Sequence, residues 1–348
     1  DSDVNGGTSV AIGHNALQAQ APATATDMYN VAVGNSAGAA VTTGGTNTLI
    51  GGLSGDALTS GNSNVAVGYL TLSSDTLGDR NVAIGRGALT AQNFTTSTDS
   101  YNVGIGYAAG GAVTTGFQNT LIGGLAGDAL TDSDKNVAVG YAALTAETLG
   151  QFNVAIGRSA LQAQNNTTAT DVYNVAVGYN AGAAVTTGSA NTLVGGLAGD
   201  ALTTGADNTA LGYNSLSAGV ASFYNTAIGK DALASDTTGR HSVAVGRDAL
   251  TAQNNTGSND MYNVAVGSNA GASVTTGSQN TLIGGLAGDA LTTGDSNVAI
   301  GKGALSADTL GARSVAIGRD ALLAQNFTTG TNTFNVAVGD RAGEVVTT

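Results

Sequence analysis

A five-residue motif recurs along the whole chain, and this repetition constrains the fold more than any other feature of the sequence. The motif reads Asn or Ser, Val or Thr, a small residue or Leu, Val, Ile or Leu, and Gly, as in residues 64–68 and 314–318. It occurs in 19 copies, which open at positions 9, 30, 47, 64, 81, 102, 119, 136, 153, 174, 191, 208, 225, 242, 263, 280, 297, 314 and 335. So regular a series predicts a stack of similar structural units.

The units come in two lengths, a short one such as 64–80 and a long one such as 81–101. Three short units and one long unit make a super-repeat, and the super-repeats span about 30–101, 102–173, 174–262 and 263–334, with partial units at 1–29 and 335–348. The third super-repeat holds an additional short unit, at 225–241. A stack tolerates insertion of a whole unit, so we interpret residues 1–348 as a single continuous repeat domain.

Each unit is expected to form a short β-strand followed by turns. The motif alternates small or polar residues with β-branched ones at a period of two, which indicates strand, and no long helical period is present. A second short strand is expected over the Ala-Leu or Ala-Gly part of the unit. Thr-Thr-Gly runs such as 186–188 are expected to turn, with Gly188 at positive φ. The fold class predicted is an all-β, parallel β-roll or β-solenoid of about 19 coils.

The motif residues are predicted to be the structural core of the repeat, and the opening asparagines to form a ladder of bonded side-chain amides. The representatives are Asn64, Val65, Val67, Gly68, Asn136, Val137, Val139, Gly140, Asn297, Val298, Ile300 and Gly301.

One coil contains few large apolar side chains, which bears on the oligomeric state. Val137, Val139, Leu144 and Leu149 are the substantial apolar residues of one unit. Full burial of such a side chain is worth about 1.5–3 kcal/mol, whereas ordering costs about 1.5 kcal/mol per residue. We therefore hypothesise a homotrimer that shares its core; the alternative is a single-chain solenoid closed by its own coil.

Composition excludes several function classes. The chain has no cysteine and two histidines, so disulfides, zinc–thiolate sites and thiol nucleophiles are excluded, and we predict neither a metal nor a cofactor. A net charge of −13 disfavours nucleic acid as a partner. No apolar run is long enough for direct membrane insertion. Neither histidine recurs in the repeat and no unique pair of carboxylates stands out, so we expect no enzymatic activity and no catalytic residues.

The strings Asn-Val-Ala-Val-Gly-Tyr at 136–141, Ser-Val-Ala-Ile-Gly-Arg at 314–319 and Asn-Thr-Ala-Ile-Gly-Lys at 225–230 resemble the head repeats of YadA-like trimeric autotransporter adhesins. Similar repeats occur in phage tail fibres. The resemblance covers nearly the whole chain, although the units here are longer than the family's head repeat. It implies a left-handed parallel β-roll of three chains, displayed on a bacterial surface to bind matrix or host-cell components.

The long units add a polar loop that we predict to protrude and to contact neighbours or receptors. The candidate contact residues are Asn93, Thr95, Asp99, Asn165, Asn166, Asp171, Asn254, Asp260 and Asn326. The loops also contain Asn-x-Thr sequons, which are acceptors for N-glycans in secreted proteins. A solvated bulge with no binding role is the alternative interpretation.

Two further solenoid functions stay open as alternatives. The segments that begin at Gly51, Gly123, Gly195 and Gly284 partly match a calcium-binding nonapeptide, but we expect their aspartates, Asp56, Asp128, Asp200 and Asp289, to cap backbone amides instead. Threonine arrays on a flat β-face bind ice, yet here the Thr-Thr pairs fall mostly at turns. The recurring Arg86, Arg158, Arg247 and Arg319 are expected to form surface or interchain pairs with Asp, worth little singly.

These observations favour a non-enzymatic, extracellular structural or adhesive fibre segment at a cell surface, or a phage tail-fibre shaft on a virion. The expected partners are copies of the same chain and a surface receptor or matrix component that the sequence does not identify. The sequence stops inside a repeat at both ends, so we expect a piece of a longer fibre, and end-to-end assembly is compatible with this.

Overall fold

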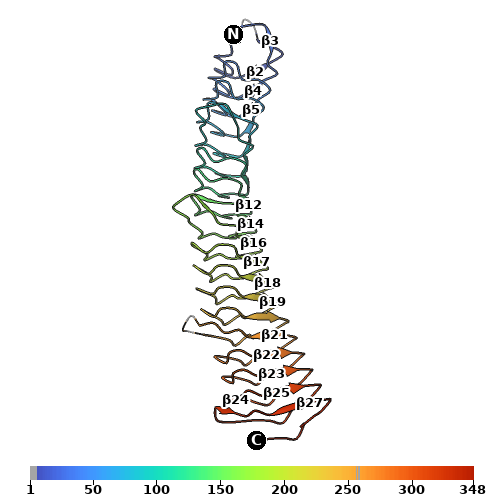
Figure 1. The fold of residues 1–348 in the computed structure, drawn as a ribbon. Coiled ribbons are helices and arrows are strands. Elements are labelled where there is room, and N and C mark those ends of the chain that lie inside the picture. The colour runs from blue at the N-terminus through green and yellow to red at the C-terminus, as the bar shows by residue number, and fades with distance from the viewer. Residues whose placement is uncertain (1–5, 256, 258) are drawn as a thin grey trace. The chain divides into compact units, whose positions relative to one another are not determined.

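The computed structural model describes residues 6–255, 257 and 259–348. The chain is an all-β, parallel β-solenoid of about 19 turns, and no helix occurs in the described residues (Figure 1). It divides into two compact units, Asp1–Tyr173 (unit 1) and Asn174–Thr348 (unit 2). The boundary between the units coincides with the end of the predicted super-repeat 102–173, and each unit is described by itself below.

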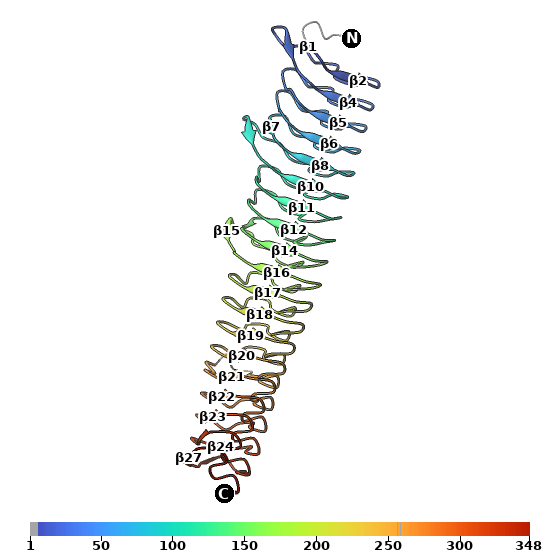
Figure 2. The ribbon, with the colours of Figure 1, turned by 90° about the vertical axis from the view of Figure 1, so that its right-hand side faces the viewer.

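In unit 1, short strands from successive coils pair in parallel, one above another (Figure 2). The longer strands, which hold the motif, are β2 (Val10–Ile12), β4 (Val31–Val33), β5 (Thr48–Ile50), β6 (Val65–Val67), β8 (Val82–Ile84), β10 (Val103–Ile105), β11 (Thr120–Ile122), β12 (Val137–Val139) and β14 (Val154–Ile156). The shorter strands are β1 (Gly6–Gly7), β3 (Thr26–Asp27), β7 (Gly78–Asp79), β9 (Thr98–Asp99), β13 (Gly150–Gln151) and β15 (Thr170–Asp171).

Unit 2 repeats this arrangement with the same parallel pairing. The motif strands are β16 (Val175–Val177), β17 (Thr192–Val194), β18 (Thr209–Leu211), β19 (Thr226–Ile228), β20 (Val243–Val245), β21 (Val264–Val266), β22 (Thr281–Ile283), β23 (Val298–Ile300), β25 (Val315–Ile317) and β27 (Val336–Val338). The shorter strands are β24 (Gly311–Ala312) and β26 (Thr331–Asn332). In both units each residue of a motif strand pairs with the residue at the same motif position in the next coil, as Thr192 does with Thr209 and Leu193 with Ala210.

Most motif strands turn the central residue inward and the two flanking residues outward; the central residue is Ala in most coils and Leu in β5, β11, β17 and β22. In β12, Ala138 is buried, whereas Val137 and Val139 are half-exposed; β6 and β23 follow the same pattern. Side chains of a strand alternate between its faces, so a strand this short has one inward position. The prediction that Val137 and Val139 fill the interior is therefore wrong. They line the outer face, together with Val65, Val67, Val298 and Ile300.

The interior is closed by leucine and alanine side chains of the single chain. Leu72, Leu89 and Leu144 are fully buried in unit 1, as are Leu216 and Leu233 in unit 2. They lie at the turn after the strand and face the inward alanines. Each coil encloses these side chains itself, so their burial in this chain does not depend on a second chain. The homotrimer stays a prediction, and the outer surface is the part of a coil that is left for contact with another chain.

The opening asparagines form the predicted ladder inside the coils. Asn64, Asn136 and Asn297 are fully buried. The ladder is built chiefly from side-chain carbonyls and backbone amides: the Oδ1 atom of Asn64 accepts the backbone N–H of Asn81 at 2.9 Å. Its Nδ2 atom donates to the carbonyl of Gly78 at 2.8 Å. Direct amide-to-amide bonds occur as well, for example Asn81 Nδ2 to Asn64 Oδ1 at 3.1 Å.

Three left-handed corners bend each typical coil, and they replace the expected second strand. In coil 64–80 these corners are Leu70 (φ 55°), Leu72 (φ 51°) and Arg80 (φ 60°). A left-handed residue other than glycine costs about 1–2 kcal/mol. The corners persist because their amides bond to neighbouring coils, such as Leu72 N–H to the carbonyl of Ala88 at 3.1 Å.

Gly188 has a role other than the one predicted for it. Its φ is not positive, unlike that of Ala190 two residues later (φ 55°). Glycine is required at position 188 because a Cβ atom there would collide with the backbone oxygen of Gly205 in the next coil. Close approach of coils, and not dihedral freedom, explains the glycine of the Thr-Thr-Gly run.

Candidate functional site

The long coils carry the distinctive surface features, because their extra residues add a short second ladder. In unit 1, β7 pairs with β9 and β13 pairs with β15, so that Asp79 faces Asp99 and Gln151 faces Asp171. In unit 2, β24 pairs with β26, and Arg240 forms isolated parallel bridges with Phe223 and Asp260. The loops 92–101, 164–173 and 253–262 also bury one apolar residue each against the coils, such as Phe94 or Met261. The loops are therefore docked structures and not simple solvated bulges.

A buried acid–glutamine pair holds the start of each of these loops. In each pair the carboxylate accepts a hydrogen bond of 2.6–2.8 Å from a glutamine side chain one coil later. The pairs are Asp75 with Gln92, Glu147 with Gln164, Asp236 with Gln253 and Asp308 with Gln325. Asp75 Oδ1 also accepts the backbone N–H of Phe94 at 3.2 Å, and Glu147 Oε1 that of Asn166 at 3.0 Å. The carboxylate thereby fixes where the extra residues leave the coil.

Burial raises the pKa of Asp75 and Asp236 above the ordinary value of 3.8, against the lowering effect of their hydrogen bonds from Gln92 and Gln253. At pH values between the ordinary and the raised pKa, the folded chain binds more protons than the unfolded chain. The free energy of unfolding therefore rises as pH falls through that interval. We expect Tm to rise as the pH falls from above the raised pKa toward 3.8, and to rise less in the variant Asp75→Ser/Asp236→Ser.

The matched control for this pH effect is Asp132→Ser/Asp207→Ser, which removes two exposed carboxyls. The slope of Tm against pH is the quantity to compare, because the absolute Tm of the buried-acid variant also reflects lost hydrogen bonds. Equal slopes in the two variants would show that the buried carboxyls do not retain protons.

Most of the predicted contact residues are on the surface, but one is not. Exposed positions are held by Asn93, Thr95, Asp99, Asn165, Asp171, Asn254, Asp260 and Asn326. Asn166 is buried, with 9% of its surface exposed. Its Nδ2 atom donates to Glu147 Oε2 at 2.9 Å, so the prediction that Asn166 protrudes is wrong. The Asn166 side chain instead anchors the loop to the buried carboxylate of Glu147 in the preceding coil.

Beside the loops, exposed or half-exposed aromatic and basic side chains occur at the last residue of many coils in each unit. We call this set the ledge; its members are Arg80, Tyr101, Lys135, Phe152, Tyr173, Tyr224, His241, Tyr262, Arg313 and Phe334. In unit 1, the rings of Phe152 and Tyr173 stack with centroids 5.2 Å apart. The Lys135 ammonium lies 4.9 Å from the Phe152 ring centroid, and Arg80 lies over Tyr101 and pairs with Asp99.

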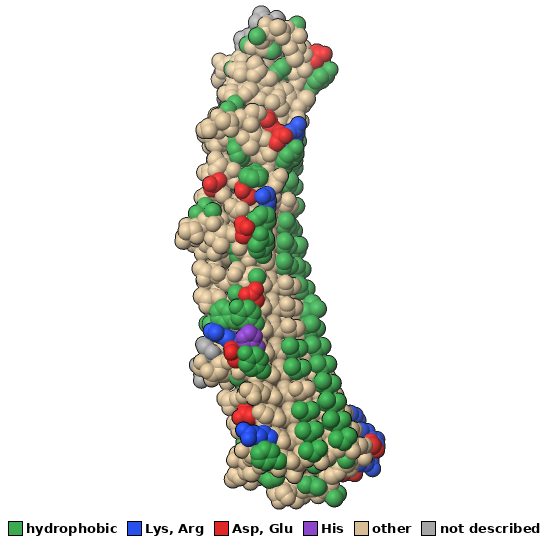
Figure 3. Space-filling view, viewed as in Figure 1, with side chains coloured by type: hydrophobic (Ala, Val, Ile, Leu, Met, Phe, Trp, Pro, Cys, Tyr) green, Lys and Arg blue, Asp and Glu red, His purple; other side chains and the backbone are tan. Residues whose placement is uncertain are grey.

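In unit 2 the ledge contains three stacked rings. His241 lies between Tyr224 and Tyr262, with centroid distances of 5.0 and 5.1 Å. Asp260 Oδ2 accepts a hydrogen bond from the Tyr262 hydroxyl at 3.2 Å, which raises the pKa of Tyr262. The opposite oxygen of Asp260 lies 3.6 Å from His241 Nε2. Figure 3 shows a histidine gathered on the surface with hydrophobic, acidic and basic side chains.

Our reading of the sequence did not predict the ledge or the buried acid–glutamine pairs. The sequence nevertheless carries signals for both. An aromatic residue precedes the opening asparagine after every long loop, at Tyr29, Tyr101, Tyr173, Tyr262 and Phe334. An acid stands at the twelfth position of the coil before a long one, and glutamine follows at the twelfth position of the long coil.

The outer face of the motif strands forms a second exposed feature. Its side chains are Val, Ile, Leu and Thr, which form columns along each unit. Hydrophobic side chains are green in Figure 3, where they form such columns. Ile84 and Ile156 in unit 1 are 37% and 38% exposed, and Leu211 in unit 2 is 46% exposed. Contiguous apolar surface of this kind marks interaction sites in soluble proteins.

The aspartates of the Gly-Gly-Leu segments do not converge on a common site. Burial raises the pKa of Asp56, Asp200 and Asp289. The Oδ1 atoms of Asp56 and Asp289 are buried without a hydrogen-bond partner, whereas Asp128 accepts the hydroxyl of Thr145 in the next coil. Within the described part of the chain, no group of three or more His, Cys, Asp or Glu side chains could hold a metal ion.

In most Thr-Thr-Gly runs the hydroxyl of the first threonine bonds to the next coil. Thr42 donates to the carbonyl of Thr59 at 3.1 Å, and Thr59 donates to that of Thr76 at 3.0 Å. In unit 2, Thr275 and Thr292 continue the same pattern. These hydroxyls link each coil to the next.

No family model matches this chain, and no curated protein matches it either. The described residues contain no helix long and apolar enough to cross a membrane.

Proposed function

We propose that this chain is a segment of an extracellular structural and adhesive fibre. The observation that carries the proposal is the recurrence of the ledge beside each docked loop, which presents the same kind of aromatic and charged surface several times within each unit. Aromatic and arginine side chains dominate the energetics of protein contacts. Repetition multiplies weak contacts through avidity. The partner proposed is a surface receptor or matrix component.

The proposed assembly is a left-handed homotrimer, packed through the outer faces of the motif strands. The half-exposed columns of Val, Ile, Leu and Thr support this, because single chains rarely leave such faces to water. The resemblance to YadA-like head repeats supports the same assembly and a location on a cell surface. End-to-end contact between fibres is compatible with it, as is a shaft on a virion.

Binding of the immobilised full chain to collagen, laminin, fibronectin and mucin tests the adhesive function. We expect at least one of the four probes to bind, and binding to fall at least about tenfold in a variant with serine at Phe152, Tyr173, Tyr224 and Tyr262. The matched control places serine at four exposed tyrosines outside the ledge, Tyr69, Tyr141, Tyr179 and Tyr213. Light scattering on the same sample should give three times the chain mass of 33.7 kDa.

Absence of binding to all four probes would contradict the adhesive function, as would an equal loss in the control variant. A particle mass equal to that of one chain would contradict the trimer. It would not affect the test of adhesion, which is measured separately.

A further inference from the structure

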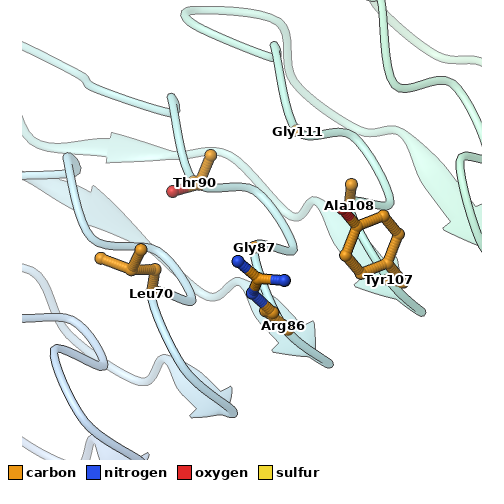
Figure 4. A pocket seen from close by; sticks show the side chains of 7 residues that line it. All are labelled: Leu70, Arg86, Gly87, Thr90, Tyr107, Ala108 and Gly111. Carbon is orange, nitrogen blue, oxygen red and sulfur yellow. The ribbon is translucent and has the colours of Figure 1, made fainter.

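A shallow pocket opens on unit 1 at the turns that follow β8 and β10 (Figure 4). It is lined by Leu70, Arg86, Thr90 and Tyr107, together with the glycines Gly87 and Gly111, and has a volume of about 190 Å³. The space beside Gly87 is open, because a Cβ atom added there would meet no atom within 4 Å. Figure 4 shows the Arg86 and Tyr107 side chains next to each other at this pocket.

Arg86 differs from Arg247 and Arg319, which stand at the same position of two other long coils. Arg247 Nε lies 3.4 Å from Asp248, and Arg319 Nε lies 2.8 Å from Asp340. These two arginines confirm the predicted surface pairs with Asp. In coil 81–101, Gly87 takes the place of Asp248, and in the next coil Tyr107 takes the place of Asp340. No carboxylate of the described residues lies within ion-pair distance of the Arg86 guanidinium.

The pocket thus combines an exposed guanidinium with an aromatic ring and apolar walls. The Arg86 Cζ atom lies 5.9 Å from the centroid of the Tyr107 ring, and that ring is 57% exposed. A guanidinium presents a planar fork of donors that matches a carboxylate. In a chain of net charge −13, long-range attraction of anions is weak, so binding here must rely on these short-range contacts.

We propose that this pocket binds the carboxylate of an acidic sugar. Arg86 holds the carboxylate, and the ring and hydroxyl of Tyr107 contact the body of the sugar. Drug-sized ligands occupy pockets of about 300–1,000 Å³, so the volume here suits one sugar residue and not a larger molecule. The site lies apart from the ledge and does not depend on the adhesive function proposed above.

Saturation-transfer NMR on the full chain, with free glucuronate as the probe, tests the site. We expect saturable binding with a Kd of about 1 mM, as befits one small ligand on an exposed site. Glucose, which lacks the carboxylate, should bind at least about tenfold more weakly. Acetate and N-acetylglutamate, which carry a carboxylate without a sugar ring, should also bind more weakly.

Two variants locate the binding and one controls for loss of charge. Gly87→Asp supplies the carboxylate that coils 242–262 and 314–334 have at this position. Asp248 and Asp320 show that aspartate tolerates the left-handed conformation there, with φ of 56° and 55°. Both Gly87→Asp and Arg86→Gln should weaken glucuronate binding at least about tenfold. Arg247→Gln removes the equivalent paired arginine and should leave binding unchanged.

Three results would overturn the proposal. The first is no detectable binding of glucuronate to the full chain. The second is equal binding to the full chain and to both pocket variants, which would place the ligand elsewhere. The third is binding of acetate or N-acetylglutamate as tight as that of glucuronate, which would mean that the pocket recognises a carboxylate and not a sugar.

Discussion

The substitution Gly140→Ala should break the stack at coil 136–152, with a loss of about 3 kcal/mol or more in the free energy of unfolding of unit 1. Gly140 has φ 137°, a conformation that side-chain-bearing residues rarely adopt. A Cβ atom there would lie 2.5 Å from the carbonyl oxygen of Gly157 in the next coil. Neither backbone can yield, because Gly140 N–H bonds to Ile122 and Gly157 N–H bonds to Val139.

Urea unfolding followed by circular dichroism measures this loss, and Gly87→Ala is the matched control. Gly87 is also at positive φ, 70°, but a Cβ atom there has open space around it. We expect the control to lose only the about 1–2 kcal/mol of a left-handed alanine. If both variants lose the same amount, the close approach between coils is not what requires glycine at the end of the motif.

Asn64→Ala should cost about 2–4 kcal/mol, because it leaves two buried backbone groups without partners. The N–H of Asn81 loses its acceptor and the carbonyl of Gly78 loses its donor. Water cannot replace them, since Asn64 and Asn81 are fully buried. Solenoid stability is close to a sum of units and their interfaces, so the damage should concentrate in the neighbouring coils.

Amide hydrogen exchange can locate this damage, with faster exchange expected at Asn81 and in the adjoining strands β6 and β8. Asn93→Ala is the control, because Asn93 is exposed and, among the described residues, the one hydrogen bond of its side chain is accepted from the Thr76 hydroxyl. The control should change stability by no more than about 0.5 kcal/mol. Unchanged protection at Asn81 in Asn64→Ala would mean that the ladder does not hold the coils together.

The sequence predicted where the candidate contact surface lies, but not which side chains form it. Long coils stand out by their length, and the docked loops occur where the extra residues fall. The ledge was not predicted, because Phe152 and Tyr173 belong to different coils and meet only when those coils stack. Arg86 was also not predicted to differ from Arg247, because the two arginines occupy the same position of the motif. Whether such an arginine has a carboxylate partner depends on the next residue and on the equivalent position one coil later, which are Gly87 and Tyr107 for Arg86.

Inspection of the repeat alone establishes the strand positions, the parallel pairing and the number of coils, because equal units stacked in register permit no other pairing of like motifs. The burial of Ala138 inside and Val137 outside depends on the tertiary fold. So does the closure of the core by one chain. Both follow from left-handed corners such as Ala142 and Leu144, which carry leucine into the coil and are stable only while adjoining coils bond their amides. No local preference of the chain encodes those bonds.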